Sequence, residues 1–333
     1  MPTWGEILVE INQELAAWRA QQHAFGAPSP FDTVRRKYVA ALQQKTGRNV
    51  ILYASKWTQG AVPDPSVTSI NAEDLHGFME VIHGLTGDDL DLVIHSPGGS
   101  AEAAEALVNY VRSKFKNVRV FVPHAAMSAA TMFCCSGDRI VMGKHSFLGP
   151  IDPQFIVRTE LGFASVPAHA IVEQFRMAQK EISDNAQTLP SWIPILRQYG
   201  PALLVQCNYQ QDLAVQLVST WLKKFMFTGQ KYAARKAKKV AKRLSDHSKF
   251  KSHNRFIDRQ QAKALGLSID DLEKDQDLQD AVLSVYHAVS LGFSATPLVK
   301  VIENHLGKTF LKLSQAIVMQ QAASPGVAPP PGP

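Results

Sequence analysis

Apolar residues recur at helical spacing in the first part of the chain and then run together as in a strand. Residues 1–45 are predicted to be helical because large apolar side chains return every three or four positions. These side chains belong to Trp4, Ile7, Leu8, Ile11, Leu15 and Trp18. Residues 48–55 (RNVILYAS) are a short apolar run typical of a strand, and Asn71 is a good N-cap for a following helix. The pattern predicts a helical N-terminal arm ahead of a mixed core.

The middle of the chain alternates strands and helices. Residues 90–95, 118–123 and 139–142 predict three buried strands. Helices are expected between them, over residues 101–115 and 129–135. Strands that alternate with helices are typical of an α/β layer with mostly parallel strands.

The remainder is expected to be helical up to a short tail. Prolines break residues 170–225 into several helices, and residues 226–300 carry a basic helix and two further helices. Residues 325–333 (PGVAPPPGP) cannot build a core. The predicted parts are a helical arm over 1–45, a catalytic core over 46–225, a basic helical C-terminal region completing the fold over 226–320, and a disordered Pro-rich tail over 321–333.

Composition narrows the class of protein. The 333 residues are 45% hydrophobic and 19% charged, which is too apolar for a disordered chain. Cys134, Cys135 and Cys207 form no Cys-x-x-Cys pair, which argues against structural zinc and fits a reducing compartment. No apolar run has the length of a transmembrane segment, and the N-terminus lacks the basic flank of a signal peptide. We therefore expect a cytoplasmic protein without a metal or an organic cofactor.

The formal net charge of +6 comes from one segment. Residues 223–243 hold nine Lys or Arg and no acid, so the rest of the chain sums to about −3. A basic helix over residues 231–243 can meet phosphate, an anionic membrane surface or an acidic partner. A solvated helix face is the commoner outcome, and no aromatic interleaving argues for stacking on nucleic-acid bases.

Two turns carry the residues best suited to catalysis. Gly98 and Gly99 follow a predicted strand, where paired glycines can aim backbone amides into a cleft as an oxyanion hole requires, although Pro-Gly-Gly is also an ordinary turn. Ser128 stands at a strand-to-helix junction among small side chains, with the amide of Ala129 next to it. A helix N-cap is the common alternative for such a serine. Open α/β sheets place their sites at the carboxyl ends of strands, so the two turns together favour a catalytic site.

Five stretches carry a resemblance to a known family. They are HSPGGSAEAAEALVNYV, VPHAAMSAATM, DRIVMGKHSFLGPIDPQF, AKALGL and FSATPLVKVIENHLG. The first two resemble the glycine turn and the nucleophile segment of the Clp protease proteolytic subunit and of signal peptide peptidase A. Together the five are similar to the serine dehydrogenase proteinase family. This resemblance implies an α/β fold, a ClpP/crotonase-like spiral of ββα units with additional helical N- and C-terminal segments.

The same resemblance implies a serine endopeptidase. Ser128 would form the acyl-enzyme, and the amides of Gly98 or Gly99 and of Ala129 would form the oxyanion hole. Its substrate would be a protein or a peptide, and the chain would assemble into a homo-oligomer. A crotonase-like acyl-CoA enzyme and a catalytically inactive scaffold of the same fold remain alternatives.

The general base is the open part of this prediction. A Clp-type histidine would fall near residues 148–150 (LGP), where there is none. Relatives of signal peptide peptidase A use a downstream lysine, and on that resemblance Lys180 is the base we expect. Such a lysine must be buried to be neutral near pH 7. Glu173 and His169 are alternatives for the same place.

Four further polar residues lie in segments of interest. His145 is close to the serine in sequence, but it follows a strand and can simply bond a turn. His253 and His305 lie in segments shared with the family, and either could be the structural partner of a buried carboxylate. Asp152 could orient a base or shape the pocket floor, and a turn aspartate before proline is the favoured interpretation.

Overall fold

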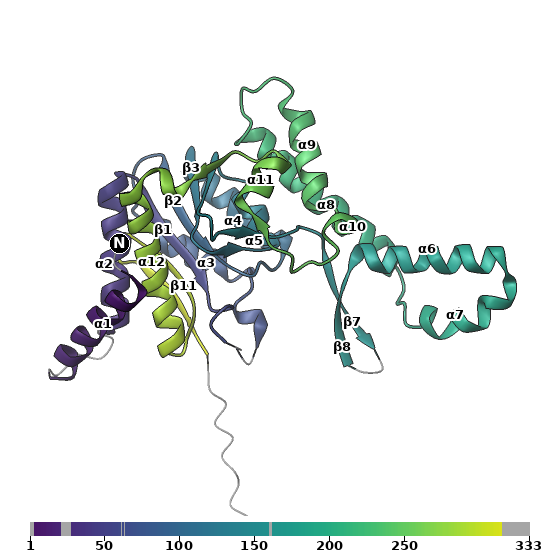
Figure 1. Cartoon of the computed structure of the whole chain (residues 1–333), viewed down its shortest axis with the longest axis horizontal. Helices are drawn as coiled ribbons and strands as arrows, with labels where there is room; N and C mark the ends of the chain where they lie inside the picture. The colour runs from purple at the N-terminus through teal and green to yellow at the C-terminus, as the bar shows by residue number, and fades with distance from the viewer. Residues whose placement is uncertain (1–2, 21–27, 61, 63, 160–161, 315–333) are drawn as a thin grey trace, which may run out of the picture.

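A central β-sheet with helices on both faces organises the protein (Figure 1). The computed structural model describes residues 3–20, 28–60, 62, 64–159 and 162–314. A narrow extension built from β7, β8, α6 and α7 projects from one side of this body (Figure 1). The predicted α/β class is confirmed.

The main sheet has seven strands in the order β10-β5-β3-β2-β1-β11-β12. Its strands are β1 (Asn49–Ser55), β2 (Asp89–His95), β3 (Asn117–Val122), β5 (Arg139–Met142), β10 (Ile269–Asp271), β11 (Leu298–Asn304) and β12 (Thr309–Leu313). The strands from β10 to β1 are parallel, whereas β11 pairs antiparallel with both β1 and β12. The carboxyl ends of β2 and β3 therefore lie at the same edge.

Two small sheets lie beyond that edge. A three-stranded sheet joins β4 (Ala125–Ala126), β6 (Phe147–Leu148) and β9 (Ile257–Asp258). A two-stranded antiparallel sheet consists of β7 (Gln154–Thr159) and β8 (Gly162–Pro167). The three-stranded sheet joins β4, which follows β3, to β9, which lies more than one hundred residues later in the chain.

The helices divide between the two faces of the main sheet and the extension (Figure 1). One face is covered by α1 (Trp4–Arg19), α2 (Pro30–Thr46) and α12 (Gln276–Ala295). The other is covered by α3 (Asp74–Ile82), α4 (Ala101–Lys114), α5 (Ala129–Cys134), α8 (Leu203–Lys224), α9 (Ala233–Leu244) and α11 (Arg259–Leu265). The remaining helices are α6 (Ala168–Asp184), α7 (Leu189–Leu196), α10 (His247–Phe250) and the short 3₁₀ turns Pro65–Val67, Ala186–Thr188 and Leu272–Lys274.

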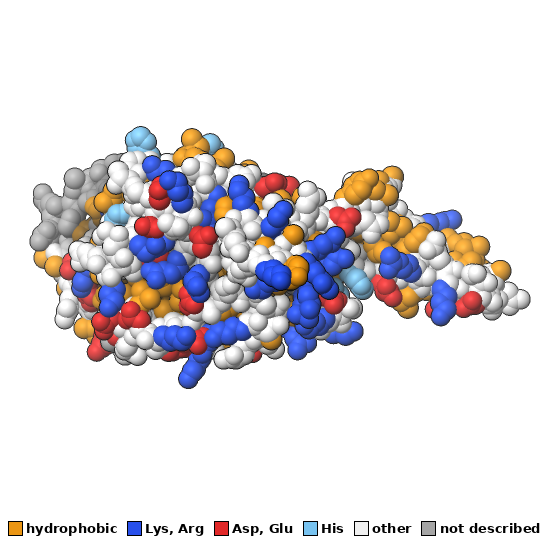
Figure 2. All heavy atoms as spheres, turned by 90° about the horizontal axis from the view of Figure 1, so that it is seen from above, with side chains coloured by type: hydrophobic (Ala, Val, Ile, Leu, Met, Phe, Trp, Pro, Cys, Tyr) orange, Lys and Arg blue, Asp and Glu red, His pale blue; other side chains and the backbone are white. Residues whose placement is uncertain are grey.

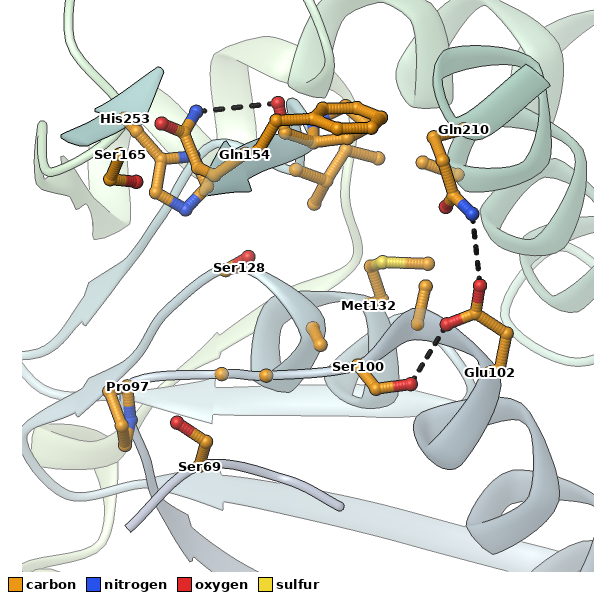
Figure 3. Close-up of a pocket in the computed structure, with 18 of the residues that line it drawn as sticks. Ser69, Pro97, Ser100, Glu102, Ser128, Met132, Gln154, Ser165, Gln210 and His253 are labelled. Carbon is orange, nitrogen blue, oxygen red and sulfur yellow. Dashed lines mark hydrogen bonds between the residues drawn. The ribbon is translucent and has the colours of Figure 1, made fainter. Parts of the chain in front are cut away.

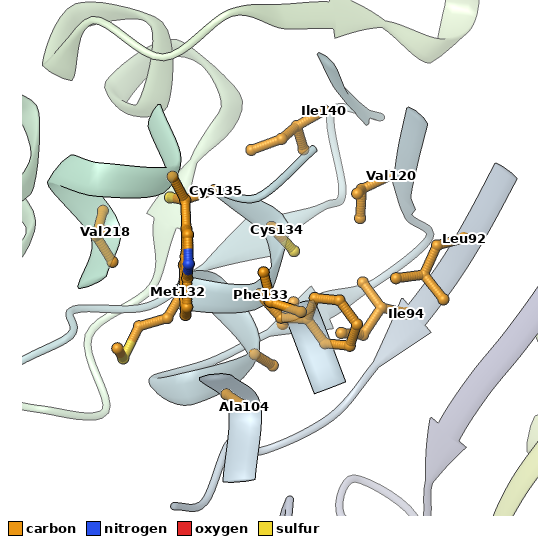
Figure 4. Close-up of a cluster of buried hydrophobic side chains, with 14 of the residues drawn as sticks. Leu92, Ile94, Ala104, Val120, Met132, Phe133, Cys134, Cys135, Ile140 and Val218 are labelled. Atoms are coloured by element: carbon orange, nitrogen blue, oxygen red, sulfur yellow. The ribbon is translucent and has the colours of Figure 1, made fainter. Parts of the chain in front are cut away.

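Short helix α5 lies inside the larger hydrophobic cluster. Phe133 and Cys134 lie beside Ile94 and Val120 of the sheet (Figure 4), and all four side chains are fully buried. Burial raises the pKa of the Cys135 thiol to about 12, so this thiol stays protonated at neutral pH. The residues that follow Ser128 are thus held rigidly by packing.

The N-terminal arm follows its predicted pattern only in part. Ile7 and Ile11 are fully buried against the cluster that contains α2 and α12. Trp4 and Trp18 are 47% and 38% exposed, so they lie at the margin of the apolar face. No helix in the described ranges is both long and apolar enough to cross a membrane.

The C-terminal region contains strands as well as the expected helices. Strands β10, β11 and β12 come from this region, and β11 pairs directly with β1 near the middle of the sheet. Hairpin β7–β8 was also unexpected. The proposed Pro-rich tail over 321–333 lies outside the described residues, and the division into four parts stays a prediction.

A buried ion pair ties β11 to helix α3. The Nζ atom of Lys300 lies 2.8 Å and 3.0 Å from the two carboxylate oxygens of Asp74, and both side chains are 0% exposed. Lys300 also donates to the carbonyl of Ser69, and the Tyr53 hydroxyl donates to Asp74. Burial lowers the pKa of the Lys300 ammonium, an effect that the Asp74 carboxylate opposes. Removing either charge would leave the other buried without a counter-ion.

Lys300→Met should lower the free energy of unfolding by about 3–5 kcal/mol, because it strands the Asp74 carboxylate in the core. Denaturant unfolding of the purified protein measures this change. The matched control is Lys312→Met, because Lys312 pairs with Glu73, whose side chain is 58% exposed. Equal, small effects of both variants would show that the buried pair does not hold β11 in place.

Candidate active site

Backbone hydrogen bonds join the glycine turn after β2 to the serine segment after β3. The amide of Ser96 donates to the carbonyl of Ala125, and the amide of Met127 donates to the carbonyl of Ser96, at 3.2 Å and 3.0 Å. These two bonds extend the parallel pairing of the sheet into the turns. They fix Gly98 and Gly99 beside Ser128.

Ser128 has a backbone conformation that few non-glycine residues adopt. Its φ is 52° and its ψ is −122°. It occupies the N-cap position of α5, yet its side chain makes no capping hydrogen bond. The N-cap alternative therefore does not account for this serine. A strained strand-to-helix turn that presents a hydroxyl is the geometry of a nucleophile elbow.

Gly98 and Gly99 are required by this close approach. Their φ values are +96° and +152°, in the region that favours glycine. A Cβ atom on Gly98 would lie 2.5 Å from the carbonyl oxygen of Met127 and 2.7 Å from the Cβ of Ser128. The turn and the serine segment are thus in direct backbone contact.

The amides around the serine differ in what they bind. The amide of Gly98 donates to the hydroxyl of Ser96 at 3.2 Å. The amides of Gly99 and Ala129 donate to no acceptor within the described part of the chain. These two amides therefore remain able to bind an anion that forms next to Ser128.

A cavity of about 600 Å³ opens over Ser128 (Figure 3). Its walls include the glycine turn with the start of α4, α5, α8, β7 with its preceding loop, β8 and the segment after α10. Ser128 and His253 face each other across it (Figure 3). No hydrogen bond joins these two side chains among the described residues. Such contacts are often long in the absence of substrate.

The carboxylate of Asp152 holds two histidines. It is 2% exposed and lies 2.9 Å from Nδ1 of His253 and 2.8 Å from Nδ1 of His247. Gln154 donates to the same carboxylate at 3.0 Å. The bond to Nδ1 fixes the ring of His253, which leaves Nε2 as the nitrogen able to face the cavity. A simple turn role for Asp152 does not describe this arrangement.

The structure does not bring Lys180 to Ser128. Lys180 is exposed on α6, which runs out along the extension (Figure 1), and it does not line the cavity. An exposed ammonium lacks the burial that a lysine base needs. Glu173, the alternative on the same helix, is also exposed.

The other candidate histidines lie elsewhere. The ring of His169 is 5.8 Å from that of His247 and does not line the cavity. His145 lines a separate cavity, and His305 accepts from the amide of Val50 at 3.3 Å. Sequence reasoning therefore included His253 without recognising its partner Asp152. Only their shared presence in family-like segments pointed to the pair.

No group of three or more His, Cys, Asp or Glu side chains is placed to hold a metal ion in the described ranges. The polar groups described at this cavity include the Ser128 hydroxyl, the amides of Gly99 and Ala129, and the His253 ring that is bonded to Asp152.

Fold and site together define the class of this protein. Neighbouring parallel strands end in a glycine turn and in a strained serine elbow, as in hydrolases that use a serine nucleophile. Residues 30–193 match the model of the ClpP-like SDH-type serine proteinases. The resemblance to the serine dehydrogenase proteinase family and the ClpP-like fold are confirmed.

Two proteins of Methanocaldococcus jannaschii are similar in sequence. Uncharacterized protein MJ0137 is 29% identical over 276 residues, or 80% of this chain and 86% of that protein. Uncharacterized protein MJ1495 is 29% identical over 183 residues, so the match spans 53% of its length and 54% of this chain. Among solved structures, a mutant of the 1510-N membrane-bound stomatin-specific protease has a TM-score of 0.37 at 12% identity, covering 64% of this chain and 79% of its own.

Gly98→Ala should displace the glycine turn from the serine segment, because the new Cβ would overlap the Met127 carbonyl. Gly84→Ala is the matched control, since Gly84 also has a positive φ but nothing lies within 4 Å of its Cβ position. Both variants should lose about 1–2 kcal/mol of stability to backbone strain. Gly98→Ala should lose clearly more in thermal or denaturant unfolding. Equal losses would contradict the close contact.

His95, at the end of β2, also bonds to the segment that precedes Ser128. Its Nδ1 atom donates to the carbonyl of Ala125 at 3.1 Å, and its ring stacks between Trp57 and His124. Burial lowers the pKa of His95 to about 3, with a smaller effect from the neighbouring His124. The neutral ring is therefore the form that joins β2 to the serine segment.

The pKa of His95 predicts a loss of stability in acid. Below about pH 6.5 the unfolded chain binds a proton at His95, whereas the folded chain does not until the pH approaches 3. The stabilisation of the fold by the neutral ring is therefore complete above pH 6.5 and falls as the pH drops toward 3. Between pH 7 and pH 5 the free energy of unfolding should fall by about 2 kcal/mol more in the wild type than in His95→Asn. The asparagine keeps a hydrogen-bond donor but does not titrate. Denaturant unfolding at the two pH values checks this, and equal losses would contradict it.

Proposed function

We propose that this protein is a serine peptidase in which Ser128 is the nucleophile and His253, oriented by Asp152, is the general base. The observation that carries the proposal is the shared cavity. Ser128, with its strained backbone, and His253 both line this cavity, and Nδ1 of His253 is bonded to a buried carboxylate. This is the relation of nucleophile, base and orienting carboxylate found in hydrolytic triads. The match of residues 30–193 to the model of a serine proteinase family supports the same chemistry.

The proposed reaction proceeds through an ester on Ser128. Nε2 of His253 takes the hydroxyl proton as Oγ of Ser128 attacks the scissile carbonyl carbon. The amides of Gly99 and Ala129 bind the resulting oxyanion, and His253 then gives its proton to the leaving amine. A water molecule, deprotonated by the same ring, cleaves the acyl-enzyme and restores the serine.

Gly98 has a supporting role in this proposal. Its amide is engaged by the Ser96 hydroxyl, so Gly99 is the better oxyanion donor of the two glycines. The missing side chain of Gly98 allows the turn to approach the serine segment. Of the three backbone positions expected from the sequence, Gly99 and Ala129 are thus the proposed oxyanion donors, and Gly98 allows the close approach of the two turns.

An extended peptide is the substrate that the cavity walls favour. Strand β7 lines the cavity and pairs with β8 along one edge only among the described residues. An open strand edge can bind the main chain of a peptide by further β-pairing. The scissile bond would then lie between that edge and the glycine turn.

The alternatives from the sequence gain no support of their own. The inactive-scaffold alternative depended on the lack of a base, and the His253 and Asp152 pair now offers one. An acyl-CoA enzyme would have no use for a strained serine. Assembly into a homo-oligomer and a cytoplasmic location stay predictions.

Labelling with a fluorophosphonate probe and hydrolysis of a fluorogenic casein test the proposal. Ser128→Ala should abolish both, and His253→Ala should lower the rate of each by about 10⁴-fold or more, as for other triads. Asp152→Asn should also lower both rates strongly, because it removes the acceptor that orients the ring.

His247→Ala is the matched control for His253→Ala. Both histidines bond to Asp152, but His247 does not line the cavity. A catalytic role predicts a much larger loss in His253→Ala, whereas a purely structural role predicts similar losses. Lys180→Ala should leave labelling unchanged. Labelling that depends on Lys180 and not on His253 would overturn the assignment of the base.

A further inference from the structure

The proposed peptidase chemistry does not use the most basic part of the chain. Residues 223–255 contain twelve Lys or Arg and a single acid, Asp246. Lys and Arg side chains gather beside the root of the narrow extension (Figure 2). None of the cations of residues 223–255 forms an ion pair with a carboxylate in the portion of the chain that the structure describes.

Part of this charge surrounds a concave pocket. A cavity of about 240 Å³ lies between the end of α9, helix α10 and helix α11. Its polar lining consists of Arg243, Lys249, Arg255 and Gln261. The rest of the lining is apolar and consists of Phe250, Ala264 and Leu265. This pocket is separate from the cavity over Ser128 and shares no lining residue with it.

The pocket presents donors and no carboxylate. The Oε1 atom of Gln261 accepts from the amide of Asp258 at 3.2 Å, which leaves its NH₂ group as the part able to donate to a ligand. The nearby Asp246 carboxylate accepts from the Ser248 hydroxyl and from the amide of Lys249 as the cap of α10. Three cations and an amide donor therefore line a pocket whose lining holds no carboxylate, and of these cations Lys249 interacts electrostatically with the nearby Asp246.

We propose that this pocket binds the phosphate group of a small molecule. Guanidinium groups match phosphate oxygens with paired, charge-assisted hydrogen bonds, and Arg243 and Arg255 supply two of them. A volume of about 240 Å³ accommodates one or two phosphate groups with a small apolar part against Phe250. A concave site of this kind suits a discrete ligand better than the flat face of a membrane or a nucleic acid.

Phosphate at this pocket would also brace the segment that carries the proposed base. Lys249 and Arg255 lie four and two residues from His253, on either side of it, and Arg243 belongs to α9. A bound anion would thus connect α9 to both ends of the His253 segment. We expect occupancy to hold His253 opposite Ser128, and this second effect rests on the proposed peptidase function.

Titration calorimetry with inorganic phosphate and pyrophosphate at constant ionic strength, with chloride as the balancing anion, tests the site. Arg255→Gln and Arg243→Gln should each weaken pyrophosphate binding by about tenfold or more, because each removes charge-assisted hydrogen bonds. The control is Lys238→Gln with Lys239→Gln, since these exposed cations of α9 do not line the pocket. Hydrogen exchange over residues 246–257 should slow when pyrophosphate binds.

Three outcomes would overturn the phosphate site. No binding of either probe, or equal weakening by the pocket and control variants, would overturn the phosphate site. Binding only to vesicles that contain phosphatidylglycerol would also overturn it, in favour of a membrane surface. Thermal unfolding of Arg255→Gln, whose side chain is exposed, checks that the variant is folded.

The activity measurement distinguishes this inference from the peptidase proposal. Pyrophosphate should raise the rate of fluorophosphonate labelling of the wild type and leave that of Arg255→Gln unchanged. Binding with slowed exchange but no change in labelling would overturn the coupling to His253 alone. Binding to a protein that never labels would overturn the peptidase and keep the phosphate site.

Discussion

The contact between Gly98 and the Met127–Ala129 backbone is the constraint on which the candidate site depends. No side chain fits between these two turns, and the bonds of Ser96 to the serine segment continue the register of the sheet up to them. Parallel pairing therefore sets the distance between the glycine turn and the serine hydroxyl. The strained backbone of Ser128 is tolerated because the helix behind it is fully buried.

Buried charge serves two purposes in this fold. The pair of Lys300 and Asp74 joins the last strands to an early helix, while Asp152 gathers two histidines beside the cavity. Burial would otherwise destabilise the ionised form of each carboxylate. In each case hydrogen bonds and charges from residues far away in the sequence compensate for this cost. Such carboxylates couple tertiary structure to the geometry of the site, since Lys300 and the two histidines lie far from them in the sequence.

Local patterns predicted the parts of the site that depend on neighbouring residues. The strand, glycine turn and serine junction were visible because turn chemistry and apolar runs act over a few positions. Strand β11 was missed because Lys300, Glu303 and Asn304 are buried within it and interrupt its apolar run. His253 was not matched with Asp152 because 101 residues separate them, and only tertiary folding brings them together. The choice of Lys180 followed resemblance alone, without knowledge of where α6 would extend.

The late position of β11 in the chain has a consequence for biosynthesis. Ser128 is translated well before His253 and before the strand that pairs with β1. A nascent chain at that stage has the Ser128 hydroxyl without the His253 ring, an unpaired edge on β1 and an Asp74 carboxylate without Lys300. The open edge of β1 makes such an intermediate prone to aggregation. Synthesis of residues 298–304 closes the open edge of β1 and supplies the counter-ion of Asp74 in the same step.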